Sequence, residues 1–156
     1  MTGLLETSEE SIADIERGLA CVVRYGNLPR IRERLIARAG IAIEPAGYAV
    51  LNRIGEAGEA RLSELAGLLG VDTSTLSRQV KQLVHDGYLA RASDPDDGRA
   101  SIIRLTRRGR HAVERIRVAR RVALEELLSD WTLDDRKRFA DLLVRFADAL
   151  MEMTAR

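Results

Sequence analysis

Residues 62–105 read LSELAGLLGVDTSTLSRQVKQLVHDGYLARASDPDDGRASIIRL, and this stretch decides the fold. Its first part predicts a short helix, because apolar residues recur there at helical spacing: Leu62, Leu65, Ala66 and Leu69. Gly70 suits the end of that helix, and Asp72 or Thr73 can cap a second one. The second helix is predicted to turn its apolar residues inward, namely Leu76, Val80, Leu83 and Val84. After Gly87, the segments 89–92 and 101–105 read as two strands joined at a tip, so the stretch predicts a helix-turn-helix followed by a wing.

The outward face of the second helix carries hydroxyl, amide and cationic side chains. At about 100° per residue, the expected members of this face are Ser74, Thr75, Arg78, Lys81 and Gln82, with Ser77 on its flank and Gln79 as a further candidate contact. No acidic residue lies between Asp72 and Asp86, whereas a solvated helix more often carries Glu together with Lys. Because these side chains can hydrogen-bond to base edges and phosphates, we predict that this helix contacts DNA.

Five short motifs in this order make the chain resemble the multiple-antibiotic-resistance regulator (MarR) family. They are LSELA at 62–66, DTSTLSRQV at 72–80, GYLAR at 87–91, DPDDGRA at 94–100 and LTRRG at 105–109. The flanking helical segments also fit, so the resemblance covers nearly the whole chain. Two residues depart from the family pattern: Arg61 stands where a capping Ser or Thr is frequent, and Gly98 stands where a wing Arg is frequent.

The resemblance implies a mainly α fold of about six helices with a small two-stranded wing. In the family, the terminal helices of two chains interlock into a dimer. We therefore expect one domain over 1–156, with a winged helix-turn-helix part at 45–105 and dimerisation helices at 8–40 and 106–156. The first and last helical segments are also apolar over more surface than one small core needs, which independently favours a partner subunit, although a larger internal core is the alternative.

Local signals set the expected bounds of the flanking helices. The first helix is expected to begin at Ser8 or Ser11 and to break at 26–29, where Gly and Pro occur. Pro45 suits the first turn of the helix that precedes the central stretch. Thr106 is expected to cap a long helix reaching about residue 129, and Thr132 with Asp135 resembles the capping pair of a last helix.

Charge is distributed unevenly along a chain whose net charge is only +1. Residues 72–121 carry 12 Lys and Arg against 6 acidic residues, while both flanking regions are acidic. A local positive stripe on a nearly neutral protein is typical of a phosphate-binding surface, although a solvated helix face is the alternative. No apolar run approaches the roughly 20 residues of a membrane span, no secretory leader is recognised, and a single cysteine excludes an internal disulfide. We expect a cytoplasmic protein.

Motifs for catalysis, cofactors or metals are not recognised. Neither His85 nor His111 has a second His, Cys or acid at a convincing ligand spacing, so each is expected to be a surface histidine. The acidic residues 94–97 fall short of a calcium-loop pattern, and we expect them to shape the wing turn. The sequence predicts no enzyme activity and no cofactor.

The resemblance also implies roles for residues outside the recognition helix. Arg99 would enter the minor groove at the wing, supported by Asp97. Family members often bind a small aromatic ligand near the junction of the dimer helices and the winged part, and three residues are candidates for lining such a pocket, with core packing as the alternative for each: Tyr25, Tyr48 and Leu51. Cys21 lies near Arg17 and Arg24 on one helix face, which could favour a reactive thiolate, although Asp14 shares that face.

Together these features predict a sequence-specific transcriptional regulator. We expect a homodimeric repressor that binds a palindromic DNA operator and is released by a small-molecule effector. One alternative is a repressor of the same fold that senses oxidants through Cys21. A second alternative is a winged-helix module that binds other proteins and not DNA; it would need an apolar or acidic recognition face.

Overall fold

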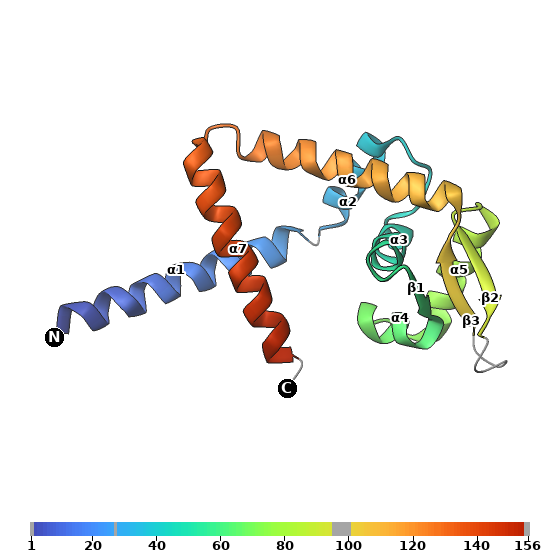
Figure 1. The fold of residues 1–156 in the computed structure, drawn as a ribbon, viewed down its shortest axis with the longest axis horizontal. Helices are drawn as coiled ribbons and strands as arrows, with labels where there is room; N and C mark the ends of the chain where they lie inside the picture. Colours follow the sequence, from blue (N-terminus) through green and yellow to red (C-terminus); the bar gives the residue numbers. More distant parts are fainter. Residues whose placement is uncertain (1, 27, 95–100, 155–156) are drawn as a thin grey trace. The chain divides into compact units, whose positions relative to one another are not determined.

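The computed structural model describes residues 2–26, 28–94 and 101–154, and side chains from residue 9 onward within those ranges. The described chain contains seven helices and three short strands (Figure 1). It divides into two compact units, Met1–Ala119 and Arg120–Arg156. No helix in the described ranges is both long enough and apolar enough to cross a membrane.

The first unit begins with three helices: α1 (Thr2–Gly26), α2 (Pro29–Ala39) and α3 (Pro45–Ala57). The predicted break between 26 and 29 is confirmed, and Pro29 and Pro45 each stand in the first turn of their helix. The predicted start of α1 at Ser8 or Ser11 was wrong, because the helix already begins at Thr2. The sequence before Ser8 contains no Pro and no pair of Gly residues that would stop a helix. The prediction placed the start too late because both serines are common capping residues.

The predicted helix-turn-helix is present as α4 (Leu62–Leu69) and α5 (Thr73–His85). Gly70 joins them with a positive φ of 64°, a conformation that Gly adopts without steric cost. Leu76, Val80 and Leu83 are buried as predicted, but Val84 is 36% exposed. The inward prediction for Val84 was wrong because it lies 100° beyond Leu83 on the helix, past the edge of the buried stripe.

The wing belongs to a three-stranded sheet, whereas two strands were predicted. Strands β2 (Leu89–Ser93) and β3 (Ser101–Leu105) form the expected antiparallel hairpin, and β1 (Glu59–Arg61) pairs with the other edge of β3. β1 has only three residues and the polar sequence Glu-Ala-Arg, so alternation could not reveal it. The pairs Leu89–Leu105 and Ser93–Ser101 mark the two ends of the hairpin.

The core of the first unit lies between α3, the helix-turn-helix, the sheet and the first half of α6 (Arg107–Leu127). Its largest fully buried side chains are Val50, Leu51, Ile54, Leu65, Leu76, Val80, Leu89 and Ile103. A second buried cluster joins α2 to α6 through Ala39, Ile116 and Ala119, with Tyr48 packed against it. The recognition helix is therefore held from several sides by residues distant in sequence.

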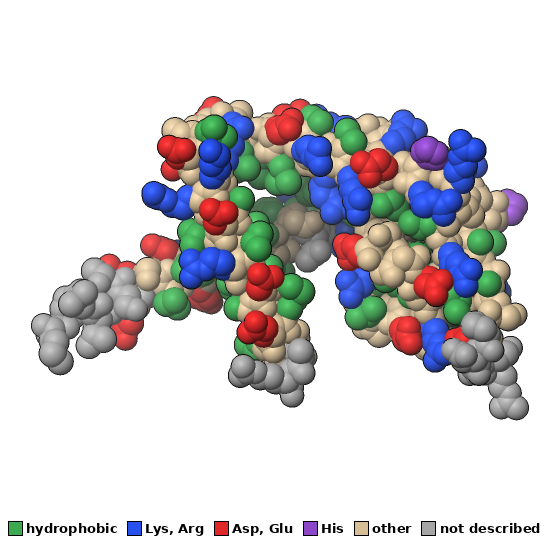
Figure 2. All heavy atoms as spheres, in the orientation of Figure 1, with side chains coloured by type: hydrophobic (Ala, Val, Ile, Leu, Met, Phe, Trp, Pro, Cys, Tyr) green, Lys and Arg blue, Asp and Glu red, His purple; other side chains and the backbone are tan. Residues whose placement is uncertain are grey.

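The second unit contains the end of α6 and all of α7 (Leu133–Thr154). Thr132 caps α7 as predicted: its hydroxyl accepts from the Asp135 backbone N–H at 3.1 Å and donates to the Asp135 carboxylate at 2.6 Å. No residue of α7 is buried, although its apolar stripe is large. Hydrophobic side chains are open to solvent along α7 between charged ones (Figure 2), including Phe139, Leu142, Leu143, Phe146 and Leu150. The second unit by itself leaves this stripe uncovered.

Candidate nucleic-acid interface

The N-terminus of α5 is fixed by Asp72, which was one of the two predicted capping residues. The Asp72 carboxylate accepts from the Thr75 backbone N–H at 2.8 Å and from the Ser74 hydroxyl. These hydrogen bonds, first that of Ser74 and then those of Thr75, hold the pKa of Asp72 well below its usual range. The cap is therefore ionised at neutral pH, and the hydroxyl of Ser74 is already engaged with the protein.

The outward face of α5 has the polar composition expected from the sequence. Ser74, Arg78, Lys81 and Gln82 are exposed as expected. Thr75, which was expected on the exposed face, is instead half-buried, as are Ser77 and Gln79. The side-chain amide of Gln82 donates to both oxygens of the Asp86 carboxylate, at 3.0 and 3.2 Å. Arg78 and Lys81 are thus the long cationic side chains that this face presents to solvent.

The wing tip lies outside the described residues, and with it the predicted contact residue Arg99 and its supporting residue Asp97. The base of the wing is described and contains an ion pair that sequence reasoning missed. Arg61, the N-cap residue of α4, reaches the Asp94 carboxylate with an Nε–Oδ2 distance of 2.6 Å. The signal available in the sequence was the departure at Arg61 from the capping residue frequent in similar proteins.

Thr106 caps α6 as the sequence predicted. It also ties α6 to the segment that follows α5, a contact that the sequence did not reveal. The Thr106 hydroxyl donates to the carbonyl oxygen of Gly87 at 2.6 Å and accepts from the Gly109 N–H at 3.0 Å. The Tyr88 carbonyl accepts from the Thr106 N–H at 3.0 Å. A Cβ on Gly109 would overlap that same carbonyl oxygen, so α6 lies against the chain that leaves α5.

Several arginines of the basic region have partners inside the protein. Arg108 lies over the Tyr88 ring with its guanidinium carbon 4.6 Å from the ring centroid, and Arg110 donates to the Leu105 carbonyl at 3.0 Å. Arg104 pairs with Glu59 across the sheet at 2.8 Å. α6 follows Leu105, at the end of the hairpin opposite the Ser93–Ser101 pair. The positive charge at the start of α6 therefore does not lie at the tip end of the wing.

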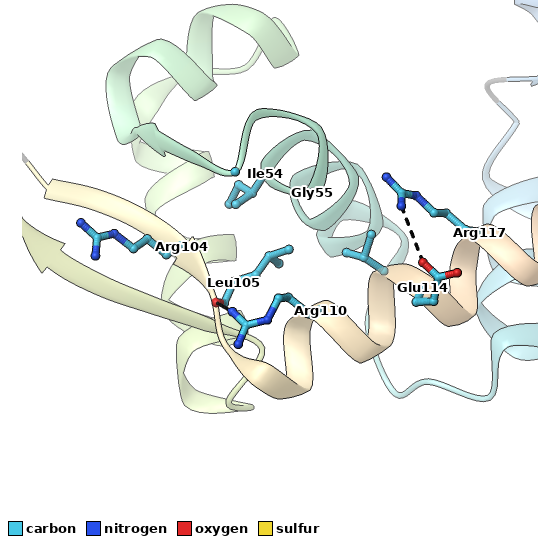
Figure 3. A pocket seen from close by; sticks show the side chains of 9 residues that line it. Ile54, Gly55, Arg104, Leu105, Arg110, Glu114 and Arg117 are labelled. Carbon is cyan, nitrogen blue, oxygen red and sulfur yellow. Dashed lines mark hydrogen bonds and ion pairs between the residues drawn. The ribbon is translucent and has the colours of Figure 1, made fainter.

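One pocket in the first unit, of about 420 Å³, lies between the end of α3, β3 and α6. Its apolar lining includes Ile54, Leu105 and Val113, and its polar lining includes Arg104, Arg110, Glu114 and Arg117. Figure 3 shows that the arginines do not converge: Arg104 points along the strand, while Arg110 turns back to the Leu105 carbonyl and Arg117 pairs with Glu114. The pocket has space and charge, but no set of polar groups aimed at one point.

The three residues considered for a ligand pocket do not line this cavity. Leu51 is fully buried in the main core, and Tyr48 is half-buried against the cluster of Ala39, Ile116 and Ala119. Tyr25 is 50% exposed on α1. Their packing agrees with the core alternative for Leu51 and in part for Tyr48, while Tyr25 lies on the surface.

Cys21 is exposed on α1, so its thiol is accessible in a single chain. Arg17, one of the two nearby cations, pairs with the Asp14 carboxylate. The negative charge of Asp14 therefore offsets the positive charge that Arg17 places near the Cys21 sulfur. His85 and His111 are exposed as predicted, and within the described ranges no group of three or more His, Cys, Asp or Glu side chains could hold a metal ion.

Known proteins resemble this chain in sequence and structure. The sequence profile of the MarR family matches residues 43–101. The uncharacterized HTH-type transcriptional regulator YxaD of Bacillus subtilis strain 168 is 34% identical over 110 residues, which cover 70% of this chain and 77% of YxaD. The HTH-type transcriptional repressor IacR of Pseudomonas putida is 29% identical over 92 residues, which cover 59% of this chain and 54% of IacR. The crystal structure of the transcriptional regulator Tm0710 of Thermotoga maritima matches with a TM-score of 0.70 at 30% identity, covering 92% of this chain and 99% of Tm0710.

Proposed function

Because the chain belongs to the MarR family of winged helix-turn-helix transcriptional regulators, we propose that it represses transcription by binding a palindromic operator as a homodimer and dissociates when a small molecule binds. Membership in the family makes the chain a DNA-binding, non-enzymatic regulator; repression, the palindrome and the effector are the proposed part. IacR, a relative named as a repressor, supports repression. The proposal places the protein in the cytoplasm, with the DNA it binds.

The outward face of α5 is the observation that carries the proposal. It combines exposed Arg78 and Lys81 with hydroxyl and amide side chains, on a helix whose other face is packed into the core. Such a face can enter a major groove, where Arg reads guanine and amides read adenine. It is neither apolar nor acidic, which argues against a module that binds only proteins. At the wing we propose that Arg99 contacts the neighbouring minor groove and that Asp97 supports it.

Dimerisation is proposed from the uncovered apolar surface of the terminal helices. The α7 stripe has no cover within the second unit, and Ile12, Ile15, Val22 and Val23 on α1 are each more than half exposed. A second copy of the chain would bury both surfaces, in keeping with the interlocked terminal helices of the family. Two recognition helices would then read two half-sites about one helical turn, or a multiple of it, apart.

Changing Phe146 to Asp on α7 is expected to shift the dimer to monomer at micromolar concentrations. Burying a Phe side chain contributes roughly 1.5–3 kcal/mol, and each dimer would lose two, so the dissociation constant should rise well over tenfold. The variant should keep its helical circular dichroism, because Phe146 is 43% exposed and is not buried within its own chain. Sedimentation velocity measures the change. Asp148→Ser is the control, because Asp148 lies on the opposite side of α7; an unchanged dimer in Phe146→Asp would contradict the proposed interface.

The proposed function is tested by selecting operators from a random duplex library and measuring affinity by fluorescence polarisation at two salt concentrations. Recovery of a palindromic site, bound more tightly than random DNA by one dimer per site, is the expected result. Failure to enrich any sequence, with binding that depends on salt alone, would contradict sequence-specific repression. A dimer with no detectable DNA binding at either salt concentration would instead favour the protein-interaction module.

A thiol switch at Cys21 is the second candidate, and the exposure of its sulfur is the observation that favours it. Because Arg17 is already paired with Asp14, we expect stoichiometric peroxide to leave operator binding unchanged in the wild type and in Cys21→Ser alike. Polarisation titrations before and after peroxide, followed by reductant, make the comparison. Reversible loss of binding in the wild type alone would establish redox sensing in place of ligand control.

A further inference from the structure

A buried carboxylate stands at the base of the wing. Among the described side chains, Asp94 is the charged one that is buried, with 4% of its surface exposed. Arg61 donates from Nε to its Oδ2 atom at 2.6 Å, while the Arg61 side chain itself remains 42% exposed. Burying a carboxylate is unfavourable unless a cation and hydrogen bonds compensate it, so the two residues depend on each other.

The ion pair joins β1 to the residue that follows β2, across the central strand β3. In the sheet order β1-β3-β2, Arg61 stands opposite Ile102, and Ile102 stands opposite Ala92. Asp94 follows Ala92 by two residues, which continues the same face of the sheet. Neighbouring strands are about 4.8 Å apart, so the two backbones lie roughly 10 Å from each other, and the Arg61 and Asp94 side chains together bridge that gap. It does so beside the Ser93–Ser101 pair, where the hairpin leads to the wing tip.

Arg61 also belongs to the helix-turn-helix. It is the N-cap residue of α4, and its backbone N–H donates to the Glu64 carboxylate at 3.3 Å. A guanidinium has no acceptor atom, so the side chain cannot cap the helix as Ser or Thr would. The side chain is directed to the wing instead. α4 packs against α5 through the core that contains Leu65 and Leu76, which completes a connection from Asp94 to the recognition helix.

We propose that the Arg61–Asp94 pair is a positioning device that sets the wing against the recognition helix and thereby determines how strongly the protein discriminates among sequences flanking its half-sites. The inference rests on the proposed DNA-binding function. With the pair intact, the wing meets the minor groove at a fixed distance from the major groove that α5 enters. Without it, α5 still reads its bases, but the wing no longer selects the narrow minor groove of A·T-rich flanks.

The first test uses the free protein and needs no DNA. Hydrogen exchange of peptides covering 89–105 should accelerate at least about tenfold in Arg61→Ala, since the opening free energy of the hairpin falls. Arg104→Ala is the matched control, because Arg104 pairs with Glu59 in the same sheet and both side chains are about half exposed, at 52% and 54%. If Arg61→Ala does not fold, Arg61→Lys and Asp94→Asn replace it. Arg61→Lys keeps the cation, so it should retain part of the protection from exchange that Asp94→Asn loses. Equal exchange in Arg61→Ala and Arg104→Ala would overturn the proposal.

The second test measures affinity for selected operators whose outer A·T pairs are kept or replaced by G·C. The wild type should prefer the A·T flanks by about tenfold, and Arg61→Ala should lower that ratio toward one while retaining preference for the half-site bases. A merely structural defect would weaken all duplexes and leave the ratio unchanged, which would overturn positioning. If the wild-type protein selects no operator, the proposed function is contradicted. The hydrogen-exchange experiment would still decide whether the ion pair holds the wing.

Discussion

Replacing Gly109 with Ala should lower the free energy of unfolding by about 3 kcal/mol, the upper end of the usual cost of overpacking. A Cβ at this position would overlap the carbonyl oxygen of Tyr88 and lie 3.1 Å from the Leu105 side chain. The carbonyl has little freedom to move, because it accepts hydrogen bonds from both the N–H and the hydroxyl of Thr106. The strain must therefore separate α6 from the segment that follows α5. Urea unfolding followed by circular dichroism measures the loss.

Gly67→Ala is the control for this prediction. Gly67 also lies in a helix, α4, but a Cβ there would meet no atom within 4 Å. Since Ala is favoured over Gly inside a helix by about 1 kcal/mol, this variant should be as stable as the wild type or more stable. A loss of stability in Gly109→Ala no larger than that in Gly67→Ala would mean that the contact between α6 and Tyr88 is loose.

Local patterns predicted most helices because their determinants lie close together in the chain. Pro29, Pro45, Gly70 and Asp72 each act on neighbouring backbone, and each stands at the helix end that the sequence predicted. The prediction that Val84 is buried was wrong because a helical wheel gives the direction of a side chain but not the width of the surface that neighbouring elements cover. β1 was not predicted because three residues are too few to display an alternating pattern.

The contacts that orient the candidate site could not be predicted, because their partners are distant in sequence. Thr106 and Gly109 were recognisable as part of a motif, but the residues that they contact, Gly87 and Tyr88, follow α5 and are about 20 residues away in sequence. Arg61 and Asp94 are 33 residues apart and meet because the sheet brings its outer strands together. The composition of the recognition face needed no such partners, which is why that part of the site was readable from the sequence alone.

The effect of Arg78 on DNA recognition is the second large expectation. Arg78 is exposed near the middle of α5, and two turns of buried Leu and Val on the opposite face hold the helix in place. A planar guanidinium can donate two hydrogen bonds to O6 and N7 of guanine, a pattern that no other base presents in the major groove. Lys81, one turn further along, presents a single flexible ammonium that suits a phosphate.

Arg78→Ala should therefore weaken operator binding by roughly 1–3 kcal/mol per half-site and relax the preference at one base pair in each. Affinity for random DNA should fall much less, because phosphate contacts dominate that binding. Lys81→Ala is the comparison: it should weaken operator and random DNA by the same factor and reduce the salt slope by about one per subunit. Polarisation titrations of both variants on both duplexes, across a salt series, separate the two roles. If Arg78→Ala loses the same factor of affinity on operator and random DNA, Arg78 contacts phosphate. Another residue of the same face must then contact the base edges.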